Sequence, residues 1–433
     1  MNAIFWFRRD LRLFDHKVLQ EALTECDSVS PIFIFDPSIL DHLHRNDHRV
    51  QFIFDNLKAL NTSLESKQKS IQIFFGKPTS VFKQLIEENT IHRVYTSADY
   101  EPYARKRDGE IAELLKEQGI ELIRKKDGVI FEQAEVVKED GSPYVVFTPY
   151  KKKWMSRLNP DEDFKEYDIA PYLDKFNTLS TKLNIVHQLS DIGFSPSTIP
   201  APTIRLNDSI INNYEDTRNF PSVPGTSQLG TSLRFGTVSI RQLAKKAYQS
   251  ANHTFLSELI WREFFQQILW HFPKTVNYSF KPAYDRIEWR NAPEDFERWK
   301  EGKTGYALVD AGMRELNATG YMHNRVRMLV ASFLCKHLLI DWRLGEAYFA
   351  EKLFDFELAS NVGNWQWAAG SGVDAAPYFR IFNPITQVKK FDSDLRYIRK
   401  WVPEFESIRY QPMVDHKFAR ERCLSTYKQA LNS

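Results

Sequence analysis

The stretch Ile4-Phe5-Trp6-Phe7 opens an alternation that decides the fold of the N-terminal part of this 433-residue chain. Four more short runs rich in β-branched or aromatic residues follow within 130 residues, and helical patterns such as 50–64 and 104–118 separate them. The four runs are 31–35, 71–75, 93–97 and 121–123. This rhythm predicts a Rossmann-like parallel sheet covered by helices, with a ligand site at the carboxyl ends of the strands.

Beyond residue 200 the pattern changes to helices. They are expected at 238–249, 254–272, 306–319, 324–337 and 345–354. Residues 131–200 are polar and interrupted by prolines, as in 194–202, which indicates a linker. The sequence therefore predicts an α/β domain over 1–130, an inter-domain linker over 131–200 and an all-α domain over 201–433.

Composition excludes several classes of protein. Apolar residues make up 42% of the chain and charged residues 26%, and no run approaches the roughly 18 to 20 apolar residues of a membrane span. Cys26, Cys335 and Cys423 lie far apart without the spacing of metal ligands. We expect neither a membrane anchor, a disulfide framework nor a metal site, and a cytoplasmic location.

Charge is unevenly distributed along the chain. Residues 1–200 carry 27 Lys+Arg and 31 Asp+Glu, whereas residues 201–433 carry 31 and 25. The basic half is compatible with a polyanion-binding face and equally with ordinary solubilising charge. The 14% aromatic content, with ten tryptophans, suits stacking on a cofactor or a base, although large cores also use such residues.

Three constellations in the second half could carry chemistry, and no G-x-G-x-x-G, P-loop, H-E-x-x-H or nucleophile-elbow motif competes with them. A hydroxyl-rich loop, 225–232, follows residues 214–218 and is either a phosphate-binding loop or a simple turn. The second constellation is 321–328, where Arg327 lies three residues after Asn324 on one helix. The Arg327 side chain either pairs with a buried carboxylate or ends in solvent.

The third constellation spans 355–367 and leads into 374–384. Two carboxylates, an amide and two tryptophans lie within 13 residues: Asp355, Glu357, Asn361, Trp365 and Trp367. A purely structural aromatic cluster seldom needs such polar neighbours, so this stretch indicates a functional site. Glu258 and Arg262, four residues apart on a largely apolar helix, form either a structural ion pair or part of the same site.

Five ordered stretches resemble the signature motifs of the photolyase/cryptochrome family. They are 6–12, 258–264, 301–306, 322–327, and 364–367 together with 383–384. The similarity covers essentially the whole chain and is greatest to bacterial class I enzymes that repair cyclobutane pyrimidine dimers. It implies an N-terminal α/β domain and a C-terminal helical domain that binds FAD without a Rossmann loop.

The resemblance implies which residues hold FAD. These are Tyr214, Thr226, Ser227, Gln228, Leu229, Gly230, Phe255, Arg262, Arg327, Asp355, Phe356, Glu357 and Asn361. Within this set, Asp355 would pair with Arg327, Glu357 would face the polar edge of the flavin ring, and Asn361 would face its N5 atom.

It also implies a light-driven reaction in which reduced flavin passes one electron to the dimer, the ring splits and the electron returns. Trp365, Trp342 and Trp289 match the three-tryptophan chain that reduces the flavin, although each one by itself is equally suited to core packing.

DNA containing pyrimidine dimers is the implied partner, with the dimer flipped into a pocket over the flavin. The residues that match dimer contacts and catalysis are Glu258, Asn324, Met328 and Asn361, with Trp261 stacking on the dimer. The residues that match contacts to the DNA around the pocket mouth are Arg218, Arg325, Arg380 and Gln387. We expect a monomer.

Some residues depart from the family pattern. Glu357 stands where Asp is usual, Tyr321 and Phe255 replace Trp, and Gly230 replaces Ser. Whether the protein has a second, antenna chromophore stays open, and deazaflavin, FMN and folate are the candidates if it does. Residues 100–104 lack the Asn-Glu pair of folate-binding relatives, which disfavours folate.

Three other functions remain as alternatives. A cryptochrome photoreceptor shares the fold, but Asn361 is the repair-type residue and we expect no long signalling tail. A (6-4) photolyase would rely on a His in the pocket where this chain has Met322-His323-Asn324 and Met328. A light-independent flavin oxidoreductase would not explain the three matched tryptophans.

Overall fold

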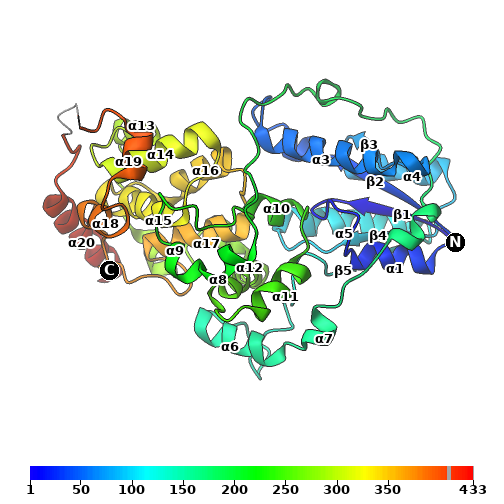
Figure 1. The fold of residues 1–433 in the computed structure, drawn as a ribbon, viewed down its shortest axis with the longest axis horizontal. Coiled ribbons are helices and arrows are strands. Elements are labelled where there is room, and N and C mark those ends of the chain that lie inside the picture. The colour runs from blue at the N-terminus through cyan, green and yellow to red at the C-terminus, as the bar shows by residue number, and fades with distance from the viewer. Residues whose placement is uncertain (407–410, 433) are drawn as a thin grey trace. The chain divides into compact units, whose positions relative to one another are not determined.

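The computed structural model describes residues 1–406 and 411–432, and the chain forms two compact units (Figure 1). The first unit comprises Met1–Val136, Trp154–Ala201 and Gly230–Gln249, and the second comprises Val137–Lys153, Pro202–Leu229 and Ser250–Ser433. The segment treated above as a linker is thus divided between the two units.

The first unit is built on a parallel five-stranded sheet, as the sequence predicts. Its strands are β1 (Asn2–Phe7), β2 (Ser28–Phe35), β3 (Gln72–Phe75), β4 (Arg93–Ser97) and β5 (Glu121–Lys125), in the order β3-β2-β1-β4-β5. The chain reverses its direction of travel across the sheet between β1 and β4, where Phe5 pairs with both Pro31 and Tyr95. Such a reversal point is where open α/β sheets bind ligands.

Both faces of the sheet are buried because successive side chains point to opposite sides. Phe5 and Phe7 pack with helices α1 (Lys17–Glu25) and α3 (His48–Leu64). Ile4 and Trp6 pack on the other face with α4 (Pro78–Glu88) and α5 (Pro102–Glu117). The expected helices at 50–64 and 104–118 are therefore confirmed as covering elements.

Buried ion pairs explain why residues 230–249 cluster with the sheet. This segment contains α10 (Gly230–Phe235) and α11 (Ile240–Gln249). Arg241 donates Nη2 to Asp127 Oδ1 at 3.0 Å and Nε to Asp15 Oδ1 at 3.1 Å, and all three side chains are buried. Charged groups withdrawn from water in this way hold their segment firmly to the sheet unit.

The second unit is helical. Its principal helices are α12 (Thr254–His271), α13 (Pro293–Lys300), α14 (Ala307–Thr319), α15 (Asn324–Ser332), α16 (Trp342–Lys352), α17 (Leu358–Ala369), α18 (Pro384–Phe391), α19 (Arg396–Trp401) and α20 (His416–Asn432). Short helices α8 (Asp208–Asn212) and α9 (Tyr214–Thr217) precede them, and a π-turn, η6 (Phe333–His337), continues α15. The sequence predicts α12, α14, α15 and α16 to within a few residues.

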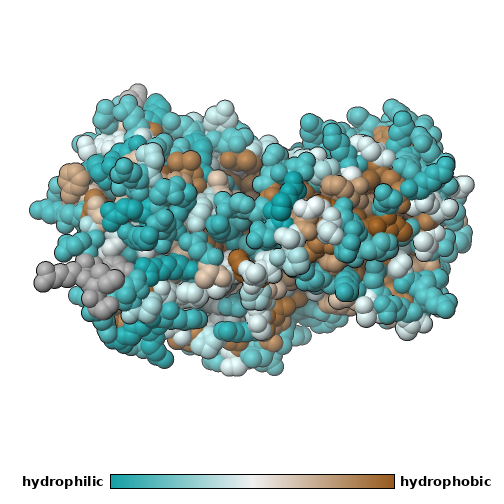
Figure 2. Space-filling model, turned by 90° about the horizontal axis from the view of Figure 1, so that it is seen from above, coloured by the Kyte–Doolittle hydropathy of each residue, from teal (hydrophilic) through white to brown (hydrophobic). Residues whose placement is uncertain are grey.

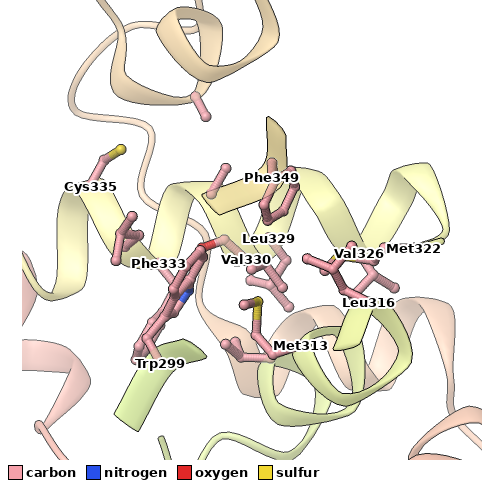
Figure 3. Close-up of a cluster of buried hydrophobic side chains, with 14 of the residues drawn as sticks. Trp299, Met313, Leu316, Met322, Val326, Leu329, Val330, Phe333, Cys335 and Phe349 are labelled. Carbon is pink, nitrogen blue, oxygen red and sulfur yellow. The ribbon is translucent and has the colours of Figure 1, made fainter. Parts of the chain in front are cut away.

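The core of this unit surrounds α15. Figure 3 shows Trp299 and Met313 facing Val326, Leu329 and Val330, all of them buried. Burying these large apolar side chains is the main source of stability for the unit. α15 is therefore a rigid platform for the polar residues at its N-terminal end.

Within the described residues, no helix is both long and apolar enough to cross a membrane. Nor do those residues contain a group of three or more His, Cys, Asp or Glu side chains placed to hold a metal ion. On the face shown in Figure 2, hydrophobic side chains form patches among hydrophilic ones.

Candidate functional site

α15, α16, α17 and the connection before α17 line one open pocket in the second unit, with about 570 Å³ of empty volume. Eight residues to which the family resemblance gave a role line it: Asn324, Arg327, Met328, Asp355, Phe356, Glu357, Asn361 and Trp365. The fold therefore brings the second and third constellations together around one cavity, although some 30 residues separate them in the chain.

The pairing expected for Arg327 is present at one wall of this pocket. Its Nη1 and Nη2 donate to the two carboxylate oxygens of Asp355 at 3.1 and 2.9 Å, and Nε donates to the carbonyl of Met322 at 2.7 Å. A two-pronged contact of this kind fixes both position and orientation. The connection between α16 and α17 is thereby tied to the start of α15.

Glu357, only 6% exposed, lies at the centre of a second polar network. Its Oε1 accepts from Arg262 Nη2 at 3.1 Å and from Gln266 Nε2 at 2.9 Å, and its Oε2 accepts from Ser360 Oγ at 3.1 Å. Arg262 and Gln266 lie one turn apart on α12, so this network joins α12 to the start of α17. The longer Glu in place of Asp is thus fully engaged by the protein.

Glu258 makes a different ion pair. Arg218 donates Nη1 to Glu258 Oε1 at 2.6 Å, and the two side chains are about one quarter to one third exposed. Glu258 and Arg262 lie four residues apart on α12 but each pairs with another segment. Glu258 pairs with Arg218, and Arg262 pairs with Glu357.

Asn361 is oriented by Glu346 of α16. Its Nδ2 donates to Glu346 Oε1 at 2.8 Å and to the Glu346 carbonyl at 3.1 Å. Burial raises the pKa of the Glu346 carboxyl. Because both amide hydrogens point to Glu346, the Asn361 Oδ1 atom remains as an acceptor at the pocket wall. Sequence reasoning missed Glu346, since nothing in its local pattern marks a residue 15 positions away as its partner.

The predicted tryptophans lie in the same unit. Trp365 and Trp342 are 2% and 1% exposed, and Trp289 is partly buried against Tyr427, with ring centroids 6.1 Å apart. Gly345 lets α16 approach α17 closely, because a Cβ at this position would lie 2.2 Å from the Trp365 ring. Trp342 is one helical turn from Gly345 on α16. A further tryptophan that the sequence analysis did not assign, Trp299, has its ring 6.2 Å from that of Trp365.

The hydroxyl-rich loop does not line this pocket. Tyr214 packs edge-on against Phe255 with ring centroids 5.1 Å apart, and Thr226 Oγ1 lies 3.5 Å from the Tyr321 hydroxyl. Burial raises the pKa of Tyr214. Gln228 adopts a left-handed backbone conformation, φ +55°, just before the chain enters α10. Ser227 and Leu229 are buried, and Gly230 begins α10 in the first unit.

The residues matched to DNA contacts differ in whether they stack on a ring, bond to another side chain or are exposed. Trp261 stacks face to face on Phe147, with ring centroids 3.7 Å apart and planes at 8°. Arg325 donates to Asn219 and lies over the Phe391 ring at 4.5 Å. Arg380 is exposed in the connection before α18, and Gln387 is partly exposed on α18.

Several pocket residues carried no assignment in the sequence analysis. They are Ala331, Phe349, Leu353, Ser360, Asn364, Trp367 and Ala368. Trp367, Ser360 and Asn364 lie in the stretch 355–367. The sequence feature that could have identified them is the high density of polar and aromatic residues in this stretch.

Comparison with known proteins shows which family the chain resembles over its length. Residues 3–168 match the family model of DNA photolyase, and residues 255–411 match that of the FAD binding domain of DNA photolyase. The deoxyribodipyrimidine photo-lyase of Escherichia coli is 36% identical over 99% of this chain and 98% of that protein. The protein of the same name from Synechococcus is 35% identical over 95% of this chain and 90% of that protein.

Solved structures give the same result. A class III photolyase from Agrobacterium tumefaciens superposes with a TM-score of 0.88 at 32% identity, covering 100% of this chain and 98% of that one. A photolyase from Sulfolobus tokodaii with two FAD molecules has a TM-score of 0.84 at 33% identity, covering 99% and 100%. A Synechocystis cryptochrome at 23% identity, with a TM-score of 0.85, shares the fold. With a third of its residues identical to full-length photolyases and both family models matched, the chain belongs to the DNA photolyase family.

Proposed function

We propose that this protein binds FAD without a covalent bond and uses light to split cyclobutane pyrimidine dimers in DNA. The observation that carries the proposal is the pocket in which the Arg327–Asp355 pair, the Glu357 network and Asn361 meet Trp365. Reduced FAD, when bound, supplies the electron that opens the dimer ring and takes it back afterwards.

The pocket residues suit an isoalloxazine ring. Asn361 donates its amide nitrogen to Glu346, which leaves its Oδ1 as an acceptor, and Trp365 and Phe356 add aromatic surface. Arg327 and Asp355 neutralise each other, so the wall they form is polar without net charge. The chain's own contribution is to orient these groups before the ligand arrives, which lowers the entropy cost of binding.

A direct experiment tests the proposal. Purified protein with chemically reduced flavin is illuminated with blue light in the presence of an oligonucleotide containing one cyclobutane dimer. Loss of the dimer is expected, and no loss in darkness. Intact dimers under light would contradict the proposal and favour the cryptochrome alternative. A parallel oligonucleotide with a (6-4) photoproduct is expected to remain unrepaired.

Glu258→Ala tests the dimer pocket proposed for Glu258, Asn324, Met328 and Trp261. A hydrogen bond to a charged group contributes about 1.5 to 3 kcal/mol, so its loss should reduce the preference for damaged over undamaged DNA roughly 10- to 100-fold. Repair per absorbed photon should also fall, while flavin content stays normal. The measurements are binding to the two oligonucleotides and dimer loss against photons absorbed.

Glu258→Gln is the matched control because it keeps an acceptor oxygen, and it should retain more of the preference than the alanine variant. Arg218→Ala removes the ion-pair partner of Glu258. Because Arg218 is itself matched to a DNA contact, this variant should also weaken binding of both oligonucleotides. Equal repair by wild type and Glu258→Ala would remove Glu258 from the proposed pocket.

Arg380→Ala tests the proposed DNA-binding mouth. Phosphate contacts carry little sequence information, so the variant should weaken binding of damaged and undamaged DNA alike. For both proteins the logarithm of affinity should fall with the logarithm of salt concentration, and the slope of the variant should be smaller by about one. Salt-independent binding by the wild type would contradict DNA binding through contacts between charged side chains and phosphates.

We also propose that the protein is a cytoplasmic monomer. Any antenna chromophore would bind at the carboxyl edge of the sheet near β1 and β4, where the strand order reverses. At this edge Arg9 Nη1 pairs with Asp99 at 3.2 Å and with Glu101 at 3.0 Å. An absorption spectrum of the purified protein with bands beyond those of flavin would identify a deazaflavin or folate chromophore, and more than one flavin per chain would indicate FMN.

A further inference from the structure

Lys336 is a buried cation that the proposed reaction does not use. It lies in the π-turn η6 and is 1% exposed. Lysine is almost never fully buried without a partner, because removing an ammonium group from water is costly. A lysine at this place therefore requires an explanation.

No anion within the described part of the chain compensates this charge. The ionisable groups around it are Cys335 and His337 of the same turn, Cys423 of α20 and Arg380. Burial raises the pKa of Cys423 to about 12 and that of Cys335 further, so both thiols are neutral at pH 7. Burial lowers the pKa of Lys336 to about 8, so the ammonium group still carries its charge at neutral pH.

The hydrogen bond of Lys336 leads to the proposed DNA-binding residue. Its Nζ donates to the backbone carbonyl of Arg380 at 2.9 Å. Arg380 belongs to the segment 375–382 between α17 and α18, in which Phe379 is 60% exposed. Among the described residues, Lys336 is the only one whose side chain forms a hydrogen bond with the backbone of segment 375–382. The other backbone hydrogen bonds of this segment join its own residues to each other.

We propose that Lys336 is a positioning residue for DNA binding, whose ammonium group holds the carbonyl of Arg380 and thereby directs the Arg380 side chain toward a DNA phosphate. The inference rests on the proposed function, because it takes Arg380 as a phosphate contact. Lys336 itself is buried and does not touch DNA. Its effect must therefore pass entirely through Arg380 and its segment.

Lys336→Met tests this role, since methionine has a similar length and no donor. Binding of damaged and undamaged DNA should weaken by roughly three- to tenfold, the range of one lost hydrogen bond. The slope of affinity against salt should fall by about one, to the value of Arg380→Ala, because one phosphate contact is lost. Flavin content and photoreduction should match the wild type.

Lys303→Met is the control for the loss of one positive charge. Lys303 is 64% exposed and pairs with Glu301 on the surface, so this variant should keep the wild-type slope. Lys336→Ala removes the same donor with a smaller side chain and replaces the methionine variant if that does not fold, with the same expected result.

The double variant Lys336→Met/Arg380→Ala separates the possible outcomes. If Lys336 acts through Arg380, the double variant should bind DNA like Arg380→Ala alone. Additive effects, or a wild-type salt slope in Lys336→Met beside a reduced slope in Arg380→Ala, would overturn the inference. If Arg380→Ala itself binds DNA like the wild type, Arg380 is not a DNA contact and the proposed function of this residue is wrong. This result differs from one in which Arg380 contacts DNA but Lys336 does not position it.

Discussion

Asp355→Ala protein is expected to purify with little flavin and to unfold about 3 kcal/mol more easily than the wild type. The substitution leaves Arg327 without its two-pronged partner in a site where the two side chains are 23% and 18% exposed. Breaking a buried pair costs roughly 3 to 5 kcal/mol, and the partial exposure places this pair at the lower end. The ratio of flavin to protein absorbance and a urea unfolding curve measure the two effects.

Two variants control this result. Asp355→Asn keeps the shape and one acceptor, so it should lose less flavin than the alanine variant. Asp295→Ala breaks a more exposed pair with Arg290, at 37% and 27% exposure, and should cost less than about 1 kcal/mol with full flavin occupancy. Full occupancy and normal stability in Asp355→Ala would show that the pair does not hold the flavin site together.

Trp342→Phe is expected to abolish photoreduction of oxidised flavin while leaving repair intact once the flavin has been reduced with dithionite. Trp342 is buried one turn from Gly345, where α16 meets the Trp365 ring, whereas Trp289 is only partly buried. The family resemblance implies that the electron path runs from Trp289 through Trp342 to Trp365. Phenylalanine fills most of the same space but is much harder to oxidise than indole. The Nε1 atom of Trp342 has no hydrogen-bond partner among the described residues, so its removal should cost the fold little.

Flavin bleaching under blue light, followed by dimer loss with and without dithionite, measures both parts of this prediction. Trp401→Phe, elsewhere in the same unit, is the matched control and should behave like the wild type. Normal photoreduction in Trp342→Phe, together with its loss in Trp299→Phe, would assign the electron path to Trp299, whose ring is 6.2 Å from that of Trp365.

Local patterns in the sequence determined most of the architecture. The strand runs at 4–7, 31–35, 93–97 and 121–123 lie within observed strands of a parallel sheet, and the run at 71–75 begins one residue before β3. Such runs are readable because burial on both faces of a sheet demands apolar residues over a short distance. The spacing of Asn324 and Arg327 left open whether Arg327 pairs with a carboxylate or ends in solvent, and the family resemblance implied the pairing with Asp355 that the structure contains.

Tertiary structure alone decided how the polar residues pair. Glu258 and Arg262 satisfy the i, i+4 rule, yet they pair with Arg218 and Glu357, 40 and 95 residues away. Glu346 orients Asn361, and Phe147 stacks on Trp261 across 114 positions of the chain. Periodicity tells which face of an element is apolar, because that depends on its own residues. Which carboxylate meets which guanidinium depends on how separate helices pack, and no local pattern contains that information.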